Sequence, residues 1–167
     1  IMLKAQHPDF EVYSAGTHAR LGISCADCHM PYMREAGRKY SSHRVTSPMK
    51  TTDASCRRCH PEDAKMLLER VRAGQKNVWE LQHIAGTRIS KAHEAISRAI
   101  TSKTINKEDL DKAREHLRRA QWYWDFVAAE NSMGFHNPAL CLNILGQSID
   151  LAHRAAESAA LATGPVP

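Results

Sequence analysis

Two copies of a five-residue pattern, Cys-x-x-Cys-His, constrain this 167-residue chain more than any other feature of its sequence. The first copy occupies residues 25–29 and the second occupies residues 56–60. In such a pattern, two thiols can add across the two vinyl groups of one haem, and the next histidine then ligates the iron. The residues assigned to this role are Cys25, Cys28, His29, Cys56, Cys59 and His60. The sequence therefore predicts two covalently attached c-type haems.

Two other uses of paired cysteines have to be weighed. Four cysteines in two pairs can bind one zinc ion, or they can form disulfide bonds in an exported protein. Zinc ribbons commonly separate their pairs by fewer residues than lie between Cys28 and Cys56. Neither use needs a histidine after each pair, so haem attachment is the interpretation that the motifs favour. The fifth cysteine, Cys141, is expected to be a small buried apolar residue of a helix.

The chain has ten histidines, more than the two motifs need. A low-potential c-type haem generally takes a second axial imidazole, so several of these histidines are candidate ligands. Four lie in loop-like or helix-entry sequence, where a ligand can be aimed: His7, His18, His43 and His136. Four more lie within expected helices, where a lone histidine is more often a surface or core residue: His83, His93, His116 and His153.

The two halves of the chain differ in their expected secondary structure. Residues 1 to about 60 contain frequent proline and glycine, which predicts loops organised by something other than side-chain packing. A short helix is expected over 62–72, with Pro61 in its first turn and Gly74 as its stop signal. Apolar residues spaced by threes and fours then predict long helices over 78–100 and 106–127. A last helix is expected from about Asn137-Pro138 to about Ala162, closed by Gly164. No β-strand is expected, and the fold class is all-α: a loop-rich multihaem region followed by long C-terminal helices.

Composition narrows the function classes. The net charge of +5 is spread along the chain. The sequence lacks the stripe of Lys and Arg with interleaved aromatic residues that is typical of nucleic-acid binding. The sequence contains no stretch of about 20 apolar residues, which a helix needs to span a membrane. The first residue is Ile1, so we expect the chain to begin after processing or partway through a longer protein.

Four further segments accompany the two motifs. They are Lys-Ala-Gln-His-Pro at 4–8, Gly-Thr-His at 16–18 before the first motif with Met-Pro after it, Ser-His at 42–43, and Ala-Gln-Trp-Tyr-Trp-Asp at 120–125 with Gly-Phe-His-Asn-Pro at 134–138. In this order and combination, they resemble the pentahaem cytochrome c nitrite reductases that form ammonia. The resemblance covers essentially the whole chain, as the C-terminal part of such an enzyme.

The resemblance implies roles for residues at the edge of an active site. His7 would be the catalytic distal histidine, which donates hydrogen bonds or protons to bound nitrite. Gln6 through its side chain, and Lys4 through its carbonyl, would ligate a structural calcium ion. The chain would divide into a dihaem-binding region with this active-site edge at 1–74, and a long-helix region with a homodimer interface at 75–167.

The resemblance also implies which histidines complete each haem. His18 would be the sixth ligand of the haem on the second motif, and His136 that of the haem on the first motif. His43 would ligate the iron of an earlier haem, whose attachment motif is not in this chain. The family binds its catalytic haem through Cys-x-x-Cys-Lys, which this sequence lacks. We therefore expect two of five haems here, with the catalytic haem in an upstream part of the enzyme.

The expected function, which the resemblance implies, is the six-electron reduction of nitrite to ammonium. The expected location is the periplasm, because haem attachment to these motifs takes place outside the cytoplasm. The expected partners are nitrite, the upstream part, a second copy of the chain, and a membrane quinol-oxidising cytochrome. Other classes remain open: a dihaem electron-transfer protein without a substrate site, a related multihaem oxidoreductase acting on hydroxylamine or sulfite, or a zinc-stabilised helical interaction protein.

Overall fold

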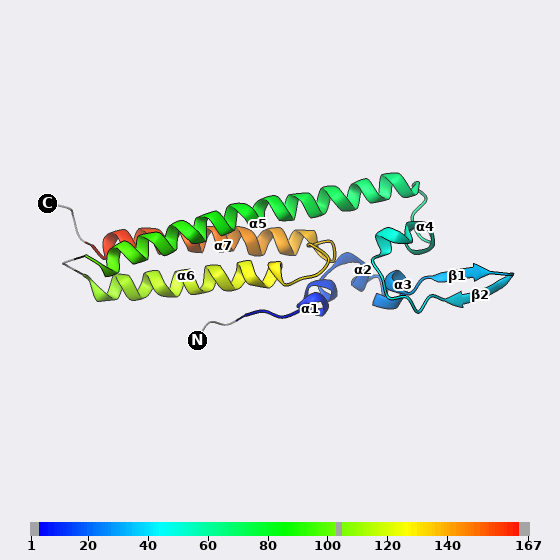
Figure 1. Ribbon diagram of the computed structural model, residues 1–167, viewed down its shortest axis with the longest axis horizontal. Coiled ribbons are helices and arrows are strands. Elements are labelled where there is room, and N and C mark those ends of the chain that lie inside the picture. The colour runs from blue at the N-terminus through cyan, green and yellow to red at the C-terminus, as the bar shows by residue number, and fades with distance from the viewer. Residues whose placement is uncertain (1–3, 103–104, 164–167) are drawn as a thin grey trace.

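Three long helices form an elongated bundle, and the smaller elements gather at one end of it (Figure 1). The computed structural model describes residues 4–102 and 105–163. In chain order the elements are α1 (Asp9–Ser14), α2 (Thr17–Arg20), α3 (Cys25–His29), β1 (Tyr32–Glu35), β2 (Arg38–Ser41), a 3-10 helix η1 (Pro48–Lys50), α4 (Thr52–Ser55), α5 (Ala64–Ile100), α6 (Lys107–Ala128) and α7 (Pro138–Leu161). The mostly helical fold class predicted from the sequence is confirmed.

The predicted apolar stripes meet in the interior of the bundle. The main cluster takes four residues from α5 (Ile89, Ala92, Ile96, Ala99), four from α6 (Leu110, Ala113, Leu117, Ala120) and four from α7 (Leu151, Ala152, Ala155, Ala159). Alanine side chains let helices approach closely, and alanine also has the highest helix propensity. Close approach is visible in a hydrogen bond between helices: the buried Ser148 hydroxyl donates to the Ala120 carbonyl at 2.7 Å.

A second apolar cluster attaches the smaller elements to the bundle. Val12 of α1 is fully buried against residues of all three long helices, among them Val78, Val127 and Leu145. Cys141 belongs to the same cluster and is fully buried, as expected for a small apolar side chain. The end of the bundle that receives α1 is also the end at which the α6–α7 loop lies (Figure 1).

The expected helix end at Gly74 is wrong. Helix α5 begins after Asp63, whose carboxylate accepts from the Met66 amide at 2.9 Å, and it runs through Gly74 to Ile100. A glycine in a helix interior costs about 1 kcal/mol relative to alanine, which a 37-residue helix packed on two others can absorb. The division of the chain at residues 74 and 75 stays a prediction, and its boundary lies inside this helix.

The absence of strands was also a wrong prediction. β1 and β2 form an antiparallel hairpin, with Tyr32 opposite Ser41 and Glu35 opposite Arg38. The turn residues Ala36 and Gly37 both have positive φ, as in the turns that suit two-residue hairpins. The strands are short and mostly exposed, so they carry no apolar alternation that sequence reasoning could detect. Among the described residues, no helix is long and apolar enough to cross a membrane.

Candidate haem centre

The first motif is held in a short, well-capped helix. Ser24 and Asp27 form a capping box, in which the Ser24 amide donates to the Asp27 carboxylate at 2.8 Å and the Asp27 amide donates to the Ser24 hydroxyl at 3.3 Å. The Ser24 hydroxyl also donates to the Asp27 carboxylate at 2.7 Å, and this bond, followed by that of the Ser24 amide, lowers the pKa of Asp27. Residues three apart lie on the same side of a helix, so Cys25 and Cys28 present two thiols in one direction, with His29 following.

The second motif forms a similar turn directly after α4. The amides of Cys59 and His60 both donate to the Cys56 carbonyl, at 3.1 and 3.0 Å. The Ser55 hydroxyl donates to the Cys28 carbonyl at 3.0 Å, which ties the two motifs together. Neither motif depends on a large apolar core, which agrees with the small, loop-rich elements around them.

Each motif histidine faces one histidine from elsewhere in the chain. The ring centroids of His60 and His18 are 6.2 Å apart, and those of His29 and His136 are 6.4 Å apart. A metal–imidazole bond is about 2 Å long, so imidazoles on opposite faces of one iron have centroids roughly 6 Å apart. Both pairs therefore have the spacing that a six-coordinate haem iron requires.

In the pair of His29 and His136, the Nδ1 atom of each ring lies close to an oxygen atom. His29 Nδ1 lies 2.9 Å from the Thr46 carbonyl oxygen, to which it can donate, and His136 Nδ1 lies 2.5 Å from Glu130 Oε1. A histidine that donates through Nδ1 has Nε2 left as a metal ligand. Two thiols and two such imidazoles are the donor set of a c-type haem, and the residues present fit this group.

The second pair also favours neutral imidazole. Burial, and then the neighbouring His60, lower the pKa of His18. A lowered pKa keeps the ring unprotonated near neutral pH, which metal binding requires. His60 Nδ1 lies 3.9 Å from the Glu62 carboxylate, beyond hydrogen-bond distance.

The cysteines do not form the alternative sites. None of the five cysteines takes part in a disulfide bond. Where the structure describes the chain, the motif sulfur atoms do not gather into one four-ligand site. The group of ligand atoms that does lie within 4.8 Å consists of Asp9, Glu130 and His136. This group is a histidine with carboxylate partners and contains no cysteine.

The residues of the expected active-site edge lie on an extended segment before α1. Lys4 and Gln6 are exposed on either side of the buried Ala5, whose amide donates to the Asp125 carboxylate at 2.7 Å. His7 is exposed and has a positive φ of 49°. Its Nδ1 lies 3.1 Å from Asn131 Nδ2 in the α6–α7 loop.

That contact defines the tautomer of His7. Asn131 Nδ2 also lies 3.1 Å from the Asp9 carboxylate, which can only accept, so this end of the amide is the NH₂ group. His7 Nδ1 consequently accepts a hydrogen bond from Asn131, and the proton of the neutral ring is on Nε2. The imidazole is thus prepared to donate from Nε2.

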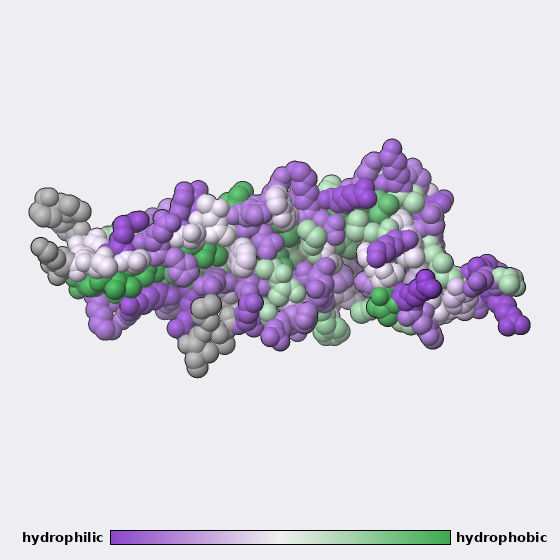
Figure 2. Space-filling view, viewed as in Figure 1, coloured by the Kyte–Doolittle hydropathy of each residue, from purple (hydrophilic) through white to green (hydrophobic). Residues whose placement is uncertain are grey.

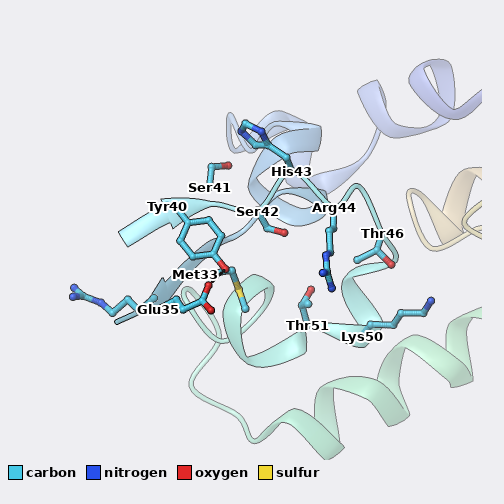
Figure 3. A pocket seen from close by; sticks show the side chains of 11 residues that line it. Met33, Glu35, Tyr40, Ser41, Ser42, His43, Arg44, Thr46, Lys50 and Thr51 are labelled. Atoms are coloured by element: carbon cyan, nitrogen blue, oxygen red, sulfur yellow. Dashed lines mark hydrogen bonds between the residues drawn. The ribbon is translucent and has the colours of Figure 1, made fainter. Parts of the chain in front are cut away.

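His43 lies apart from both histidine pairs, on an exposed segment after β2. It contributes to the lining of a cavity of about 1210 Å³, whose walls come from the hairpin, residues 42–46 and the η1–α4 region. In Figure 3, Arg44 and Thr51 lie on one side of this cavity, whereas the His43 ring points away from them. Neither Cys-x-x-Cys-His motif lines the cavity.

Comparison with known proteins decides the family. The sequence model of the cytochrome c552 family matches residues 1–164, nearly the entire chain. The chain belongs to the cytochrome c552 family. The resemblance predicted from the motifs and their companion segments is thereby confirmed, and haem c is the cofactor that membership implies.

Named proteins from other bacteria are similar to this cytochrome. The cytochrome c nitrite reductase subunit NrfA of Nitratidesulfovibrio vulgaris is 44% identical over 97% of the chain and 32% of its own length. A cytochrome c-552 of Parabacteroides distasonis is 40% identical over 92% of the chain and 31% of its own length. The chain thus spans about a third of the length of the curated relatives it matches.

A solved structure shows the same architecture. The catalytic subunit NrfA of the cytochrome c nitrite reductase from Desulfovibrio desulfuricans, described for its two calcium sites, superposes with a TM-score of 0.92 at 41% identity. The match covers 97% of the chain and 35% of that subunit. The outer cell wall cytochrome OcwA, 20% identical with a TM-score of 0.64, shares the fold.

Sequence reasoning missed one residue of this cytochrome's candidate centre. Glu130 is only 3% exposed and accepts hydrogen bonds from Ser132 and Gly134 as well as contacting His136. Burial by itself raises the pKa of Glu130, but the hydrogen bonds from His136, Gly134 and Ser132 outweigh it and lower the pKa to about 2. In the sequence, an acidic residue six positions before a candidate ligand in a turn gives no sign that it is buried.

Proposed function

We propose that this chain is the C-terminal part of a periplasmic cytochrome c nitrite reductase that converts nitrite to ammonium. Two c-type haems on this chain relay electrons to a catalytic haem held by residues outside it. The observation that carries this proposal is the pairing of each motif histidine with a distant histidine at iron-ligating separation. Family membership and similarity to nitrite reductase subunits support the reaction assigned.

The first motif and the α6–α7 loop hold one haem. Cys25 and Cys28 would hold it through thioether bonds, and His29 and His136 would ligate its iron. The Thr46 carbonyl orients the His29 ring through its Nδ1. When bound, each haem supplies one-electron redox chemistry.

The second motif and α2 hold the other haem. Cys56 and Cys59 would hold it through thioether bonds, and His60 and His18 would ligate its iron. Because Ser55 bonds directly to the Cys28 carbonyl, the two attachment sites are adjacent, which suits electron transfer between them.

The segment before α1 forms one edge of the nitrite site. Nitrite nitrogen is at +3 and ammonium nitrogen at −3, so the reaction consumes six electrons and eight protons and releases two water molecules. His7 donates from Nε2 to the bound anion, in the tautomer that Asn131 fixes. Gln6 and the Lys4 carbonyl contribute oxygen ligands to a calcium ion, whose charge favours an anionic substrate.

The rest of the enzyme lies beside this chain in the proposed assembly. His43 would ligate the iron of one of the haems attached upstream, and five haems are expected in the full enzyme. The long helices form the interface of a homodimer in this proposal. The electron donor is a membrane quinol-oxidising cytochrome.

The test is a cofactor count on the full native polypeptide, together with turnover. Intact mass under denaturing conditions and pyridine haemochrome content should give five haems, two of them on peptides containing these motifs. The reduced protein should be reoxidised by nitrite with ammonium as product. Two haems and no oxidation by nitrite would identify a dihaem electron carrier instead, and oxidation by hydroxylamine or sulfite alone would identify a related oxidoreductase.

A further inference from the structure

Glu130 is the most completely enclosed charged group that contacts a paired histidine. Its side chain has no exposed surface and receives hydrogen bonds on both oxygens. Oε1 accepts from the Ser132 amide at 3.1 Å and lies 2.5 Å from His136 Nδ1. Oε2 accepts from the Ser132 hydroxyl and the Gly134 amide, both at 2.8 Å. A carboxylate with this many donors is fixed in position and ionised.

The two motif histidines, His29 and His60, have partners that differ from Glu130 in charge or in distance. His29 Nδ1 faces the Thr46 carbonyl, which is neutral. The carboxylate nearest His60, that of Glu62, is 3.9 Å away and takes its closer ion pair from Arg70 at 2.6 Å. Of these three histidines, His136 is the one with a carboxylate oxygen at hydrogen-bond distance of its Nδ1.

Such a carboxylate changes how an imidazole binds metal. It fixes the Nδ1–H tautomer and the ring orientation, and it raises the basicity of the opposite nitrogen. A more basic axial ligand gives more electron density to the iron and stabilises the oxidised state, which lowers the reduction potential.

We propose that Glu130 is a positioning residue, which holds the His136 ring and makes the haem of the first motif the lower in potential of the two on this chain. The inference rests on the proposed haem attachment and adds a direction to the electron relay. Electrons would reside preferentially on the haem of the second motif. The haem of the first motif would be reduced only briefly, and it would be the stronger reductant of the two.

The experiment uses the full haem-loaded protein and four variants. Glu130→Ala removes both the charge and the acceptor, whereas Glu130→Gln keeps one carbonyl acceptor for the His136 Nδ1–H and removes the charge. Glu157→Gln is the matched control, because Glu157 also pairs with a histidine, His153, but on the exposed surface of α7. His136→Met identifies the electron paramagnetic resonance signal and the redox step that belong to the first haem.

We expect Glu130→Ala to shift the reduction equilibrium of that haem about tenfold toward the reduced form, which is about 59 mV for one electron. Its resonance signal should move as the ring loses its orientation. Glu130→Gln should raise the potential by less and keep the signal close to the native one. Glu157→Gln should change neither.

Three results would overturn the proposal, and they differ from one another. Native potential and native signal in both Glu130 variants would remove the role of Glu130 while leaving haem attachment intact. An unchanged spectrum in His136→Met would remove His136 as a ligand. Absence of haem from the peptide containing Cys25 and Cys28 in the unmodified protein would overturn the proposed function itself. Because Glu130→Gln retains one of the two acceptor oxygens, it decides the question even where the alanine variant fails to accumulate.

Discussion

Gly134 is the residue of the α6–α7 loop at which a single methyl group should be most damaging. Its φ is +84°, and a Cβ placed there would lie 2.7 Å from Val78 Cγ2 and 3.0 Å from Cγ1. A left-handed backbone costs a residue with a Cβ about 1–2 kcal/mol. Overpacking a filled core adds about 1–3 kcal/mol, and Val78 is only 1% exposed in such a core. We therefore expect Gly134→Ala to lower the free energy of unfolding by about 2–5 kcal/mol.

Gly22 provides the matched control. Its φ of +75° is nearly the same, but a Cβ there would meet nothing within 4 Å. Gly22→Ala should therefore cost only the backbone contribution of about 1–2 kcal/mol. The difference between the two variants isolates the clash with Val78, and Val78→Ala in a double-mutant cycle should recover most of it.

The assay is denaturant unfolding of the full haem-loaded protein, followed by far-ultraviolet circular dichroism and by Soret absorbance. Coincident midpoints from the two probes justify comparing free energies. Equal losses in Gly134→Ala and Gly22→Ala, or no recovery in the double mutant, would refute the packing argument. Gly134 also donates to Glu130, so its variant should perturb the Soret band at lower denaturant than the control does.

Three further predictions concern other contacts. Ser148→Ala should cost about 1 kcal/mol in the same unfolding assay, because it removes the hydrogen bond to the Ala120 carbonyl but leaves no large cavity; no loss would show that this bond does not stabilise the bundle. Asn131→Ala should lower kcat for nitrite in the full enzyme about tenfold with little change in KM, because His7 loses its fixed tautomer; an equal loss in an exposed control, Asn143→Ala, would contradict it. Burial, and then the charge of Glu130, raise the pKa of Cys141 to about 12. Iodoacetamide at pH 8 should therefore label no thiol in the native holoprotein and Cys141 alone after denaturation, and a higher count by mass spectrometry would mean that thioether bonds are missing.

The sequence was sufficient for features that depend on local spacing. The stripes of α5 and α6 follow from intervals of three and four, and residues such as Ala92 and Ala113 are buried as that periodicity requires. The Cys-x-x-Cys-His motifs carry their chemistry in five consecutive residues, so no fold was needed to recognise them. Gly74 shows the limit of local rules, because tertiary packing continues the helix through a residue that usually ends one.

The arrangement of the site could not be derived from spacing. His29 and His136 are 107 positions apart, and nothing in either neighbourhood selects the other. The pairing came from resemblance to a family, and the structure brings together the same two pairs. Glu130 was missed for a related reason: its burial depends on donors at Ser132 and Gly134 that exist only when the loop folds over them.

The long helices serve the site because they hold the α6–α7 loop against the smaller elements. The Gln75 side chain of α5 donates to the Ser132 carbonyl at 3.0 Å, which fixes the loop from the bundle side. From the other side, the Asn131 amide donates to the Asp9 carboxylate of α1 at 3.1 Å. Gly16, before α2, approaches the His136 carbonyl so closely that a Cβ there would lie 2.4 Å from its oxygen.

These contacts explain why one loop can serve both histidine pairs. Phe135 lies beside His18, with ring centroids 6.4 Å apart, and the next residue is His136 of the other pair. A displacement of the loop would therefore alter both candidate axial ligands together. The bundle supplies no ligand of its own to either pair from α5, so its contribution is the rigid placement of this loop. Substitutions in the alanine-rich core should consequently affect the haem centre by displacing residues 130–136, and not by replacing a ligand.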